Sequence, residues 1–188
     1  SILRRHPRVA VYLSNDGEIS PSTLVQRLWK AGRQVFLPVL HPLGHNSLWF
    51  IPYHRHTPLR RNRYGIPEPS RPGRRAPPWT MSLVFTPLVA FDPQGNRIGM
   101  GGGFYDRTFD RRRPRATDVR LTGLAHAFQE VGQLPFDPWD TPLHAVVTDC
   151  RRHFFRGSRH ASVASASRCL TGLRAQAGHR EQARAGSE

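Results

Sequence analysis

The segment from Asn96 to Asp106 carries the residues whose types and spacing best suit a chemical site. It reads Asn-Arg-Ile-Gly-Met-Gly-Gly-Gly-Phe-Tyr-Asp, and it lies between an apolar, strand-like run and a predicted helix. Glycines in this position let backbone N–H groups converge on an anion, and the helix N-terminus adds its positive dipole. The arrangement suits a phosphate group. A flexible turn that needs several positive φ angles would use the same glycines, so both interpretations stay open at this stage.

Several familiar motifs are absent from the sequence. No Gly-Lys-Ser/Thr follows the glycines, which excludes a Walker A loop, and Phe104 stands where a GxGxxG fingerprint would need its last glycine. No Gly-x-Ser-x-Gly elbow occurs, Cys150 has no evident activating partner, and the histidines show no zinc-type spacing. The chemistry that remains is phosphate binding without an acid–base triad.

Three carboxylates could serve such a site. Asp106 closes the glycine segment and Asp140 lies in a Pro-rich turn further along the chain, and two carboxylates at one phosphate site could hold Mg²⁺. The pattern alone favours a plainer reading, in which Asp106 is a first-turn helix acid and Asp140 a turn residue. Glu18 follows the first predicted strand, where open parallel sheets bind ligands, although a solvated acid before a helix is equally consistent.

The start of the chain predicts the elements that must position these residues. Residues 9–13 are a short β-branched run, and residues 34–40 are a second apolar strand. Between them, Ser20 and Pro21 supply a capping hydroxyl and a first-turn proline for a helix that stops at Gly32. Strand, helix and strand in close succession form a βαβ unit. We therefore expect an α/β fold, with three α/β/α layers and a mostly parallel sheet.

The remainder of the sequence predicts further strands and one more helix. Residues 54–80 are dense in Arg and Pro and are expected to be mostly irregular loop. The other predicted elements are an edge strand at 47–53, one buried strand at 83–91, a helix from Phe104 to Pro114, and the last two strands at 119–127 and 145–148. Residues 1–149 are therefore expected to form the folded domain, and residues 150–188 a basic, low-complexity, disordered tail.

The charge balance is unusual and leaves two interpretations open. The 188 residues include 28 Lys and Arg but 13 Asp and Glu, a formal net charge of +15, and Lys30 is the sole lysine. An excess of this size is typical of a protein with a phosphate-rich partner such as a nucleic acid. An arginine-biased composition would spread the same charge over any tolerant surface. Aromatic residues are not interleaved with the basic segments, which argues against a nucleic-acid partner.

The sequence also bears on where the protein works. No apolar run approaches the roughly 20 residues that a membrane-spanning helix needs, and no long apolar segment follows the first residues. The two cysteines, Cys150 and Cys169, lie in the last quarter of the chain, a usage that fits a reducing compartment. We therefore expect a cytoplasmic protein without a membrane partner.

The ordered motifs of the chain resemble one family. They are Tyr12-Leu13-Ser14 with Glu18, the segments 62–69, 85–92 and 99–106, and then 140–143 and 146–148. In order and spacing these segments are similar to those of the 5-formyltetrahydrofolate cyclo-ligase (5,10-methenyltetrahydrofolate synthetase) family over about residues 8–149. The resemblance implies a fold of the sugar-phosphate-isomerase and CoA-transferase-like group. It also implies ring closure of 5-formyltetrahydrofolate through a phosphorylated formyl intermediate, with ATP as co-substrate and Mg²⁺ as the metal.

The resemblance also implies roles for individual residues. The ATP-binding positions are Arg97, Ile98, Gly99, Met100, Gly101, Gly102, Gly103, Phe104 and Tyr105. The folate-binding positions are Leu13, Glu18, Tyr64 and Gly101 to Tyr105. Tyr105 is the implied catalytic residue, and Asp106 with Asp140 are the implied Mg²⁺ ligands, which reverses the plainer reading of the two acids.

One departure from the family pattern bears on ATP binding. Family members usually begin with a basic helix whose side chains reach the ATP phosphates, whereas here only Arg4, Arg5 and Arg8 precede the first strand. We therefore expect either a truncated chain or a member with impaired ATP affinity. The partners implied are folate and ATP, with the chain a monomer. The rival hypotheses are a basic nucleic-acid-binding protein and a catalytically impaired family member.

Overall fold

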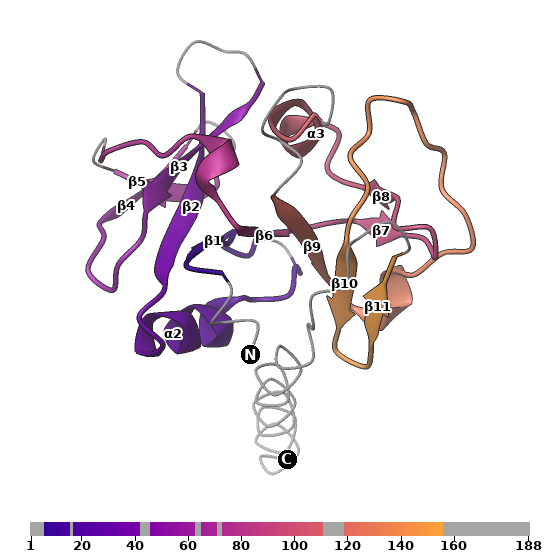
Figure 1. Ribbon diagram of the computed structural model, residues 1–188, viewed down its shortest axis with the longest axis horizontal. Coiled ribbons are helices and arrows are strands. Elements are labelled where there is room, and N and C mark those ends of the chain that lie inside the picture. The colour runs from indigo at the N-terminus through magenta and orange to yellow at the C-terminus, as the bar shows by residue number, and fades with distance from the viewer. Residues whose placement is uncertain are drawn as a thin grey trace, which may run out of the picture.

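The computed structural model describes residues 6–15, 17–41, 46–62, 65–70, 73–110 and 119–155, which build one seven-stranded sheet and two small two-stranded sheets. In spatial order the large sheet contains β11 (Arg152–Phe154), β10 (Ala145–Thr148), β9 (Arg120–Ala125), β6 (Leu83–Thr86), β1 (Arg8–Ala10), β2 (Gln34–Leu40) and β3 (Leu48–Pro52). The five central strands run parallel, and β3 and β11 pair antiparallel at the two edges. The mostly parallel sheet is confirmed (Figure 1).

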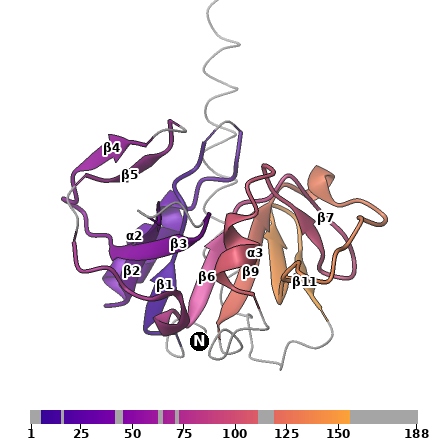
Figure 2. The same ribbon diagram turned by 90° about the horizontal axis from the view of Figure 1, so that it is seen from above.

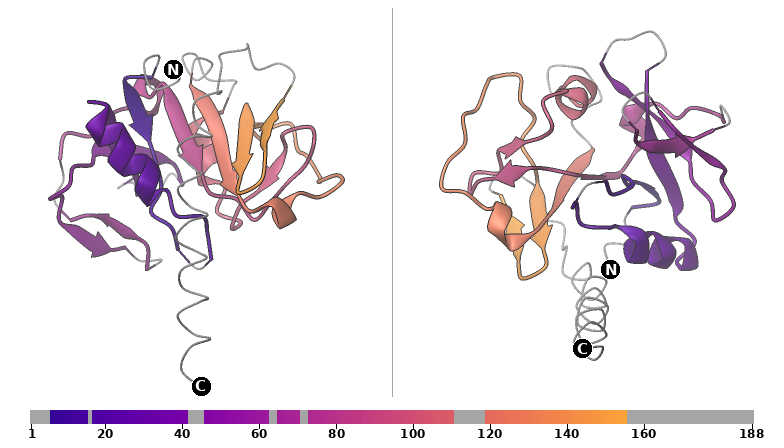
Figure 3. Two further views of the ribbon diagram at one scale, coloured as in Figure 1. Left: turned by 90° about the horizontal axis from the view of Figure 1, so that it is seen from below. Right: turned by 180° about the vertical axis from the view of Figure 1, so that it is seen from behind.

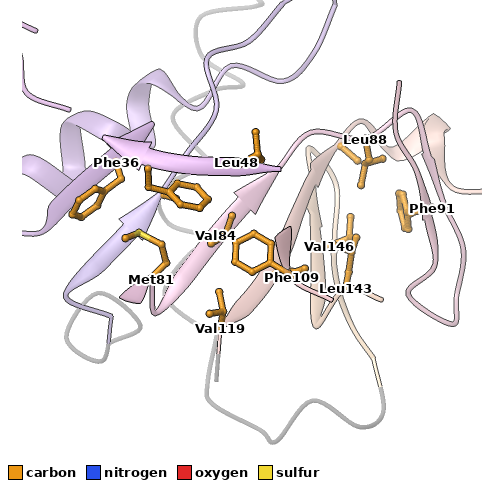
Figure 4. Packing of buried hydrophobic residues seen from close by; sticks show 14 of the residues in the cluster. Phe36, Leu48, Met81, Val84, Leu88, Phe91, Phe109, Val119, Leu143 and Val146 are labelled. Atoms are coloured by element: carbon orange, nitrogen blue, oxygen red, sulfur yellow. The ribbon is translucent and has the colours of Figure 1, made fainter. Parts of the chain in front are cut away.

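Helices cover both faces of this sheet. Helix α2 (Ser22–Lys30) lies on one face and α3 (Phe104–Thr108) on the other, and Figure 3 shows them on opposite sides of the strands. Neighbouring residues of a strand point to opposite faces, so Phe85 joins the core under α2 while Val84 joins the core next to α3. Figure 4 shows Phe109, which follows α3, beside Val84 in that second core. The three-layer α/β/α fold is confirmed.

The predicted βαβ unit is present at the start of the chain. Strand β1 pairs parallel with β2 in the register Val9 to Val35, and α2 connects them. The helix begins one residue later than predicted, because Pro21 is the N-cap and accepts the Val25 N–H through its carbonyl (2.9 Å). It ends as predicted, with Gly32 in the left-handed region at φ +66°.

The strand predicted at 83–91 is wrong in its extent. Strand β6 stops at Thr86, directly before Pro87, which has no N–H to donate to a sheet. The chain then leaves the large sheet and forms β7 (Ala90–Phe91), which pairs antiparallel with β8 (Arg97–Ile98) in a sheet of their own. The turn predicted between them at 92–96 is present, with Gly95 at φ +89°.

The predictions for the second half of the chain also need correction. Helix α3 ends at Thr108, well before Pro114, and residues 111–118 lie outside the described residues. The sheet does not finish with the strand at 145–148, because β11 follows it and Phe155 is buried in the core. The stretch expected to be a disordered tail from residue 150 therefore begins with an edge strand, and residues 156–188 lie outside the described part.

The Arg- and Pro-rich stretch at 54–80 contains more regular structure than predicted. Strands β4 (Leu59–Arg61) and β5 (Pro67–Pro69) pair antiparallel, and a 3-10 turn, η1, spans Pro78–Thr80. Strand β5 begins and ends with proline, a residue that is uncommon in strands, so its composition predicts a loop rather than this short pairing. Among the residues that the structure describes, no helix is long and apolar enough to cross a membrane.

Candidate functional site

The carboxyl ends of the parallel strands bring several distant segments to one edge of the sheet. The loop after β1, the chain after β6 and the chain after β9 all leave from this edge, where β1, β6 and β9 lie side by side (Figure 2). His126, after β9, approaches the loop after β1, with its Nε2 at 3.3 Å from the Gly17 carbonyl oxygen. The Ala127 N–H donates to Asp149 Oδ1 (2.9 Å), which joins the chain after β9 to the chain after β10, the next parallel strand. This edge is where open α/β sheets bind ligands.

The loop after β1 holds Glu18 in a defined position. The Asn15 N–H donates to Glu18 Oε2 (2.9 Å), and the Glu18 N–H donates to the Asn15 carbonyl (3.1 Å). The Tyr12 hydroxyl donates to the Ile19 carbonyl (2.6 Å), which anchors the far side of the loop to the core. Leu13 is partly buried against the α2 core. The carboxylate is thus presented by a loop that is tied at both ends.

The glycine segment adopts the backbone that its sequence predicts. Gly101 and Gly103 have φ of +80° and +56°, and Gly103 is the left-handed N-cap of α3. A Cβ on Gly102 would come within 2.5 Å of the Phe104 ring, so a side chain there would displace it. The Met100 side chain is 75% exposed. The segment is therefore an open turn whose backbone, rather than its side chains, can meet a ligand.

A charged pair fixes both ends of this turn. Arg97, in β8 before the glycines, pairs through Nη2 with Asp106 Oδ1 at 2.7 Å, and the Arg97 side chain is only 6% exposed. The Thr141 N–H donates to the same Asp106 oxygen (3.1 Å), and Arg97 Nη1 donates to the Thr141 carbonyl. The three residues close a ring around the base of the loop and tie it to the segment that carries Asp140.

The two predicted metal ligands lie in neighbouring segments. Asp140 directly precedes Thr141, which bonds Asp106, and the Asp137 N–H donates to Asp140 Oδ2 (3.0 Å). Among the described residues no group of three or more His, Cys, Asp or Glu side chains gathers as a metal cage. Mg²⁺ commonly uses one or two carboxylates and completes its shell with water and substrate phosphates. The donor chemistry of the two acids therefore fits a Mg²⁺ ion that is bound together with a phosphate group.

Tyr105 connects the glycine segment electrostatically with the Glu18 loop. Burial raises the pKa of Tyr105 above its ordinary value, Arg97 opposes this rise, and Glu18 reinforces it. Burial likewise raises the pKa of Tyr12, and Glu18 and Tyr105 add to it. Both phenols are therefore protonated at neutral pH, and Tyr12 uses its O–H to donate to the Ile19 carbonyl. The structure brings Glu18 and Tyr105, 87 residues apart in the sequence, into one electrostatic environment.

Tyr64 lies outside the described residues, although its hairpin neighbours are placed. The Asn62 N–H donates to the Ile66 carbonyl (2.9 Å), and the Gly65 N–H donates to the Asn62 carbonyl (2.9 Å). The role of Tyr64 stays a prediction.

Arg107 is a residue at this site that sequence reasoning missed. Its guanidinium turns back onto the glycine segment, where Nη2 donates to the Gly102 carbonyl. In the sequence Arg107 reads as one of many basic helix residues, and no spacing rule sets it apart from the other arginines. Its position over the loop is set by the short helix α3, which turns the side chain back toward Gly102.

Comparison with known proteins matches these features to one family. The model of the 5-formyltetrahydrofolate cyclo-ligase family matches residues 1–149. The chain belongs to this family. It is similar to the 5-formyltetrahydrofolate cyclo-ligase of Escherichia coli, at 48% identity over 74% of this chain and 76% of that protein. It is also similar to the Haemophilus influenzae 5-formyltetrahydrofolate cyclo-ligase, at 43% identity over 77% of this chain and 76% of the relative.

Solved structures agree with this assignment. The NMR structure of Aquifex aeolicus 5,10-methenyltetrahydrofolate synthetase superposes with a TM-score of 0.65 at 29% identity, covering 85% of this chain and 77% of that one. A synthetase structure from Mycoplasma pneumoniae shares the fold, with a TM-score of 0.56 at 21% identity. The family resemblance and the α/β fold are thus confirmed, and the chain is a member of an ATP-dependent ligase family. The sugar-phosphate-isomerase and CoA-transferase-like grouping stays a prediction.

Proposed function

We propose that this protein converts 5-formyltetrahydrofolate to 5,10-methenyltetrahydrofolate, with ATP consumed and ADP and phosphate released. The observation that carries the proposal is the family match over residues 1–149, which includes the whole carboxyl edge described above. The anchored glycine turn and the fixed Glu18 loop at that edge support it. With two cysteines and a single α/β core, we further propose that it acts as a cytoplasmic monomer.

The reaction needs activation of a poor leaving group. The formyl oxygen on N5 attacks the γ-phosphorus of ATP, and the bond between that phosphorus and the bridging oxygen breaks to release ADP. N10 then attacks the formyl carbon, the carbon–oxygen bond breaks to release phosphate, and N10 loses its proton. Catalysis of this kind depends on positioning and charge neutralisation, which agrees with the lack of an acid–base triad in the sequence.

The Glu18 loop is the proposed folate-binding side. A carboxylate suits the amino and ring N–H donors of a pterin, and Glu18 is held by the Asn15 N–H in a loop that Tyr12 anchors. Leu13 supplies an apolar contact, and Tyr64 is proposed to stack on the pterin ring. Gly101 to Tyr105 would meet the same substrate from the opposite side.

The glycine turn is the proposed ATP-binding side. Residues 97–105 would cradle the phosphates through backbone N–H groups, and the buried Arg97–Asp106 pair keeps the turn in place. Asp106 and Asp140 would hold Mg²⁺, which neutralises phosphate charge as the γ-phosphoryl group is transferred.

Tyr105 is the proposed catalytic residue. A tyrosine phenol is protonated at neutral pH, and burial raises the pKa of Tyr105 still further, so its O–H is available to donate a hydrogen bond. Placed on α3 directly after the glycines, it would donate to oxygen in the group being transferred.

The proposal is tested with purified protein, ATP, Mg²⁺ and 5-formyltetrahydrofolate, following the absorbance of the methenyl product. Product formation that depends on both ATP and folate is the expected result. Absence of product, in a preparation whose circular dichroism shows the folded sheet, would reject the activity. Titration with a non-hydrolysable ATP analogue then identifies a member that has lost ATP binding, and titration with duplex RNA or DNA tests the nucleic-acid alternative.

A further inference from the structure

Arg107 occupies a position over the glycine turn that needs an explanation beyond helix formation. Its Nη2 donates to the Gly102 carbonyl, and a Cβ on Gly103 would lie 3.0 Å from Nη2 and 3.2 Å from Cζ of the same guanidinium. Any side chain at Gly103 would therefore crowd the arginine. The missing Cβ lets this cation sit directly against the backbone that is proposed to bind phosphate.

The two arginines beside the turn differ in how their charge is balanced. Arg97 is buried and paired with Asp106 at 2.7 Å. In the segments that the structure describes, no carboxylate lies within ion-pair distance of Arg107, and its contacts there are to the carbonyl oxygens of Gly102 and Asn46. Carbonyl oxygens orient a guanidinium but do not cancel its charge. The turn therefore carries one balanced and one unbalanced cation.

The second contact of Arg107 places it on the ligand-facing edge. Its Nε donates to the Asn46 carbonyl (3.2 Å), and Asn46 lies in the connection that follows the carboxyl end of β2. Asn46 has φ +44°, a left-handed conformation that is uncommon outside glycine. Arg107 thus contacts two loops at the carboxyl edge of the sheet. A guanidinium has five N–H donors, and these two contacts use only one on Nε and one on Nη2.

We propose that Arg107 binds the phosphates of ATP in this protein and stabilises the charge on the γ-phosphoryl group during transfer. A guanidinium offers two parallel N–H donors that match phosphate oxygens, and an arginine that is already oriented loses little freedom on binding. This assignment rests on the proposed function, because it names a further residue at the same site. It also provides a cationic contact from within α3 itself.

The test compares Arg107→Gln and Arg107→Lys with the unaltered protein. The glutamine amide nitrogen stands where Arg107 Nε stands, so it can still donate to the Asn46 carbonyl but has no charge. Lysine keeps the charge without the paired donors. We expect the KM for ATP to rise at least about tenfold and kcat to fall in Arg107→Gln, with the KM for folate within about twofold. Arg107→Lys should recover part of the ATP effect.

Arg33→Gln is the matched control. Arg33 also donates to a backbone carbonyl, that of Ala31 (3.1 Å), but it lies between α2 and the start of β2, at the opposite edge of the sheet. Its kinetic constants should equal those of the unaltered protein. Equal increases in the KM values for ATP and folate in Arg107→Gln, or no change in either, would overturn the proposal, since a purely structural role acts on both substrates.

A nucleotide titration separates this inference from the overall function. Where the unaltered protein forms no methenyl product, the proposed function fails, and a non-hydrolysable ATP analogue is titrated into both proteins. Weaker binding to Arg107→Gln, with the Arg33→Gln control unchanged, supports the assignment. Equal affinities, or no binding to the unaltered protein, refute it.

Discussion

Two regions of the molecule are built on different principles. The first is the glycine-turn region, residues 92–106, which includes the β7–β8 turn and the glycines. Here Asp92 is fully buried, and its carboxylate accepts the N–H groups of Gln94, Asn96 and Leu134 and the Asn96 side-chain amide. The Arg97–Asp106 pair adds a second buried anchor. In the β4–β5 hairpin, the Arg60 side chain is 67% exposed and lies 3.8 Å from Glu68.

The two regions differ in how tightly their polar groups fix the backbone. The carboxylates of Asp92 and Asp106 each have several partners at short distances, so the backbone that they hold is preorganised for an anionic ligand. The hairpin depends on backbone pairing between two three-residue strands and on an ion pair whose arginine is exposed. A surface of this kind can adapt to a larger, flatter ligand at little energetic cost. The predictions below test whether the contrast holds.

The largest effect is expected at Asp92. Asp92→Ala removes an acceptor that four donors share, and it leaves the buried Leu134 N–H and three partly buried donors without this partner. We expect a loss of about 4 kcal/mol in the free energy of unfolding, measured by urea denaturation, because each unsatisfied buried group costs about 1–3 kcal/mol. Arg60→Ala, which removes the 67%-exposed arginine of the hairpin ion pair, is the control and should cost less than about 1 kcal/mol. Equal losses would contradict the contrast.

The second effect concerns the Arg97–Asp106 pair. Asp106→Asn leaves the buried Arg97 guanidinium without its counter-charge, and we expect a loss of about 2–3 kcal/mol together with loss of methenyl formation. The stability loss is present without Mg²⁺ or ATP, which distinguishes the pairing role from metal binding.

A double-mutant cycle completes this test. Arg97→Met removes the cation, so adding Asp106→Asn to it should cost much less than Asp106→Asn alone, with a coupling of at least about 1 kcal/mol. Additive losses in urea denaturation would show that the two side chains do not depend on each other.

The contrast also explains which parts of the molecule were predictable from the sequence. The βαβ unit, the parallel sheet and the positive φ angles at Gly101 and Gly103 follow from local rules: apolar runs, a helix stop and glycines between strand and helix. The family resemblance found the Glu18 loop and the glycine segment because both are contiguous motifs. Features that a single contiguous segment determines could therefore be predicted from the sequence.

Features that depend on contacts between distant segments could not be predicted from the sequence. The apolar run 83–91 looks like one strand, but Pro87 sends its second half to pair with β8. The last strand, β11, has a mixed polar sequence and is defined by pairing with β10. Arg107 gains its meaning only from Gly102 and Asn46, which come from different parts of the chain. Tertiary contacts, rather than local propensity, decide these positions.

A third, smaller effect is expected where the Glu18 loop meets the core. Tyr12→Phe removes the hydroxyl that donates to the Ile19 carbonyl at 2.6 Å, which should cost about 1 kcal/mol of stability. Because Glu18 precedes Ile19, we expect the KM for folate to rise severalfold while the KM for ATP stays unchanged. Equal changes in both values would show that the loop is not specific to folate.

The pH dependence of the same variant gives a second readout. Burial, followed by Glu18 and Tyr105, raises the pKa of Tyr12 in the folded state above its ordinary value. As the pH rises, the Tyr12 hydroxyl therefore loses its proton in the unfolded chain before it does so in the folded protein. Tyr12 makes its full contribution to the free energy of unfolding below a pH of about 10, and ionisation lowers the free energy of unfolding above that pH. Tyr12→Phe should make the alkaline fall in urea midpoint shallower, and an unchanged slope would assign that fall to other groups.

The smallest effect is expected in the hairpin. Arg60→Ala removes an exposed partner of Glu68 at 3.8 Å, and we expect a change within about 0.5 kcal/mol that vanishes at high salt. A loss above about 1.5 kcal/mol in urea denaturation would mean that the hairpin is held as firmly as the glycine turn. The kinetic comparison is sharper still: since Arg60 lies on β4 and not at the glycine turn, the KM for ATP should not move, and any change should appear in the KM for folate alone.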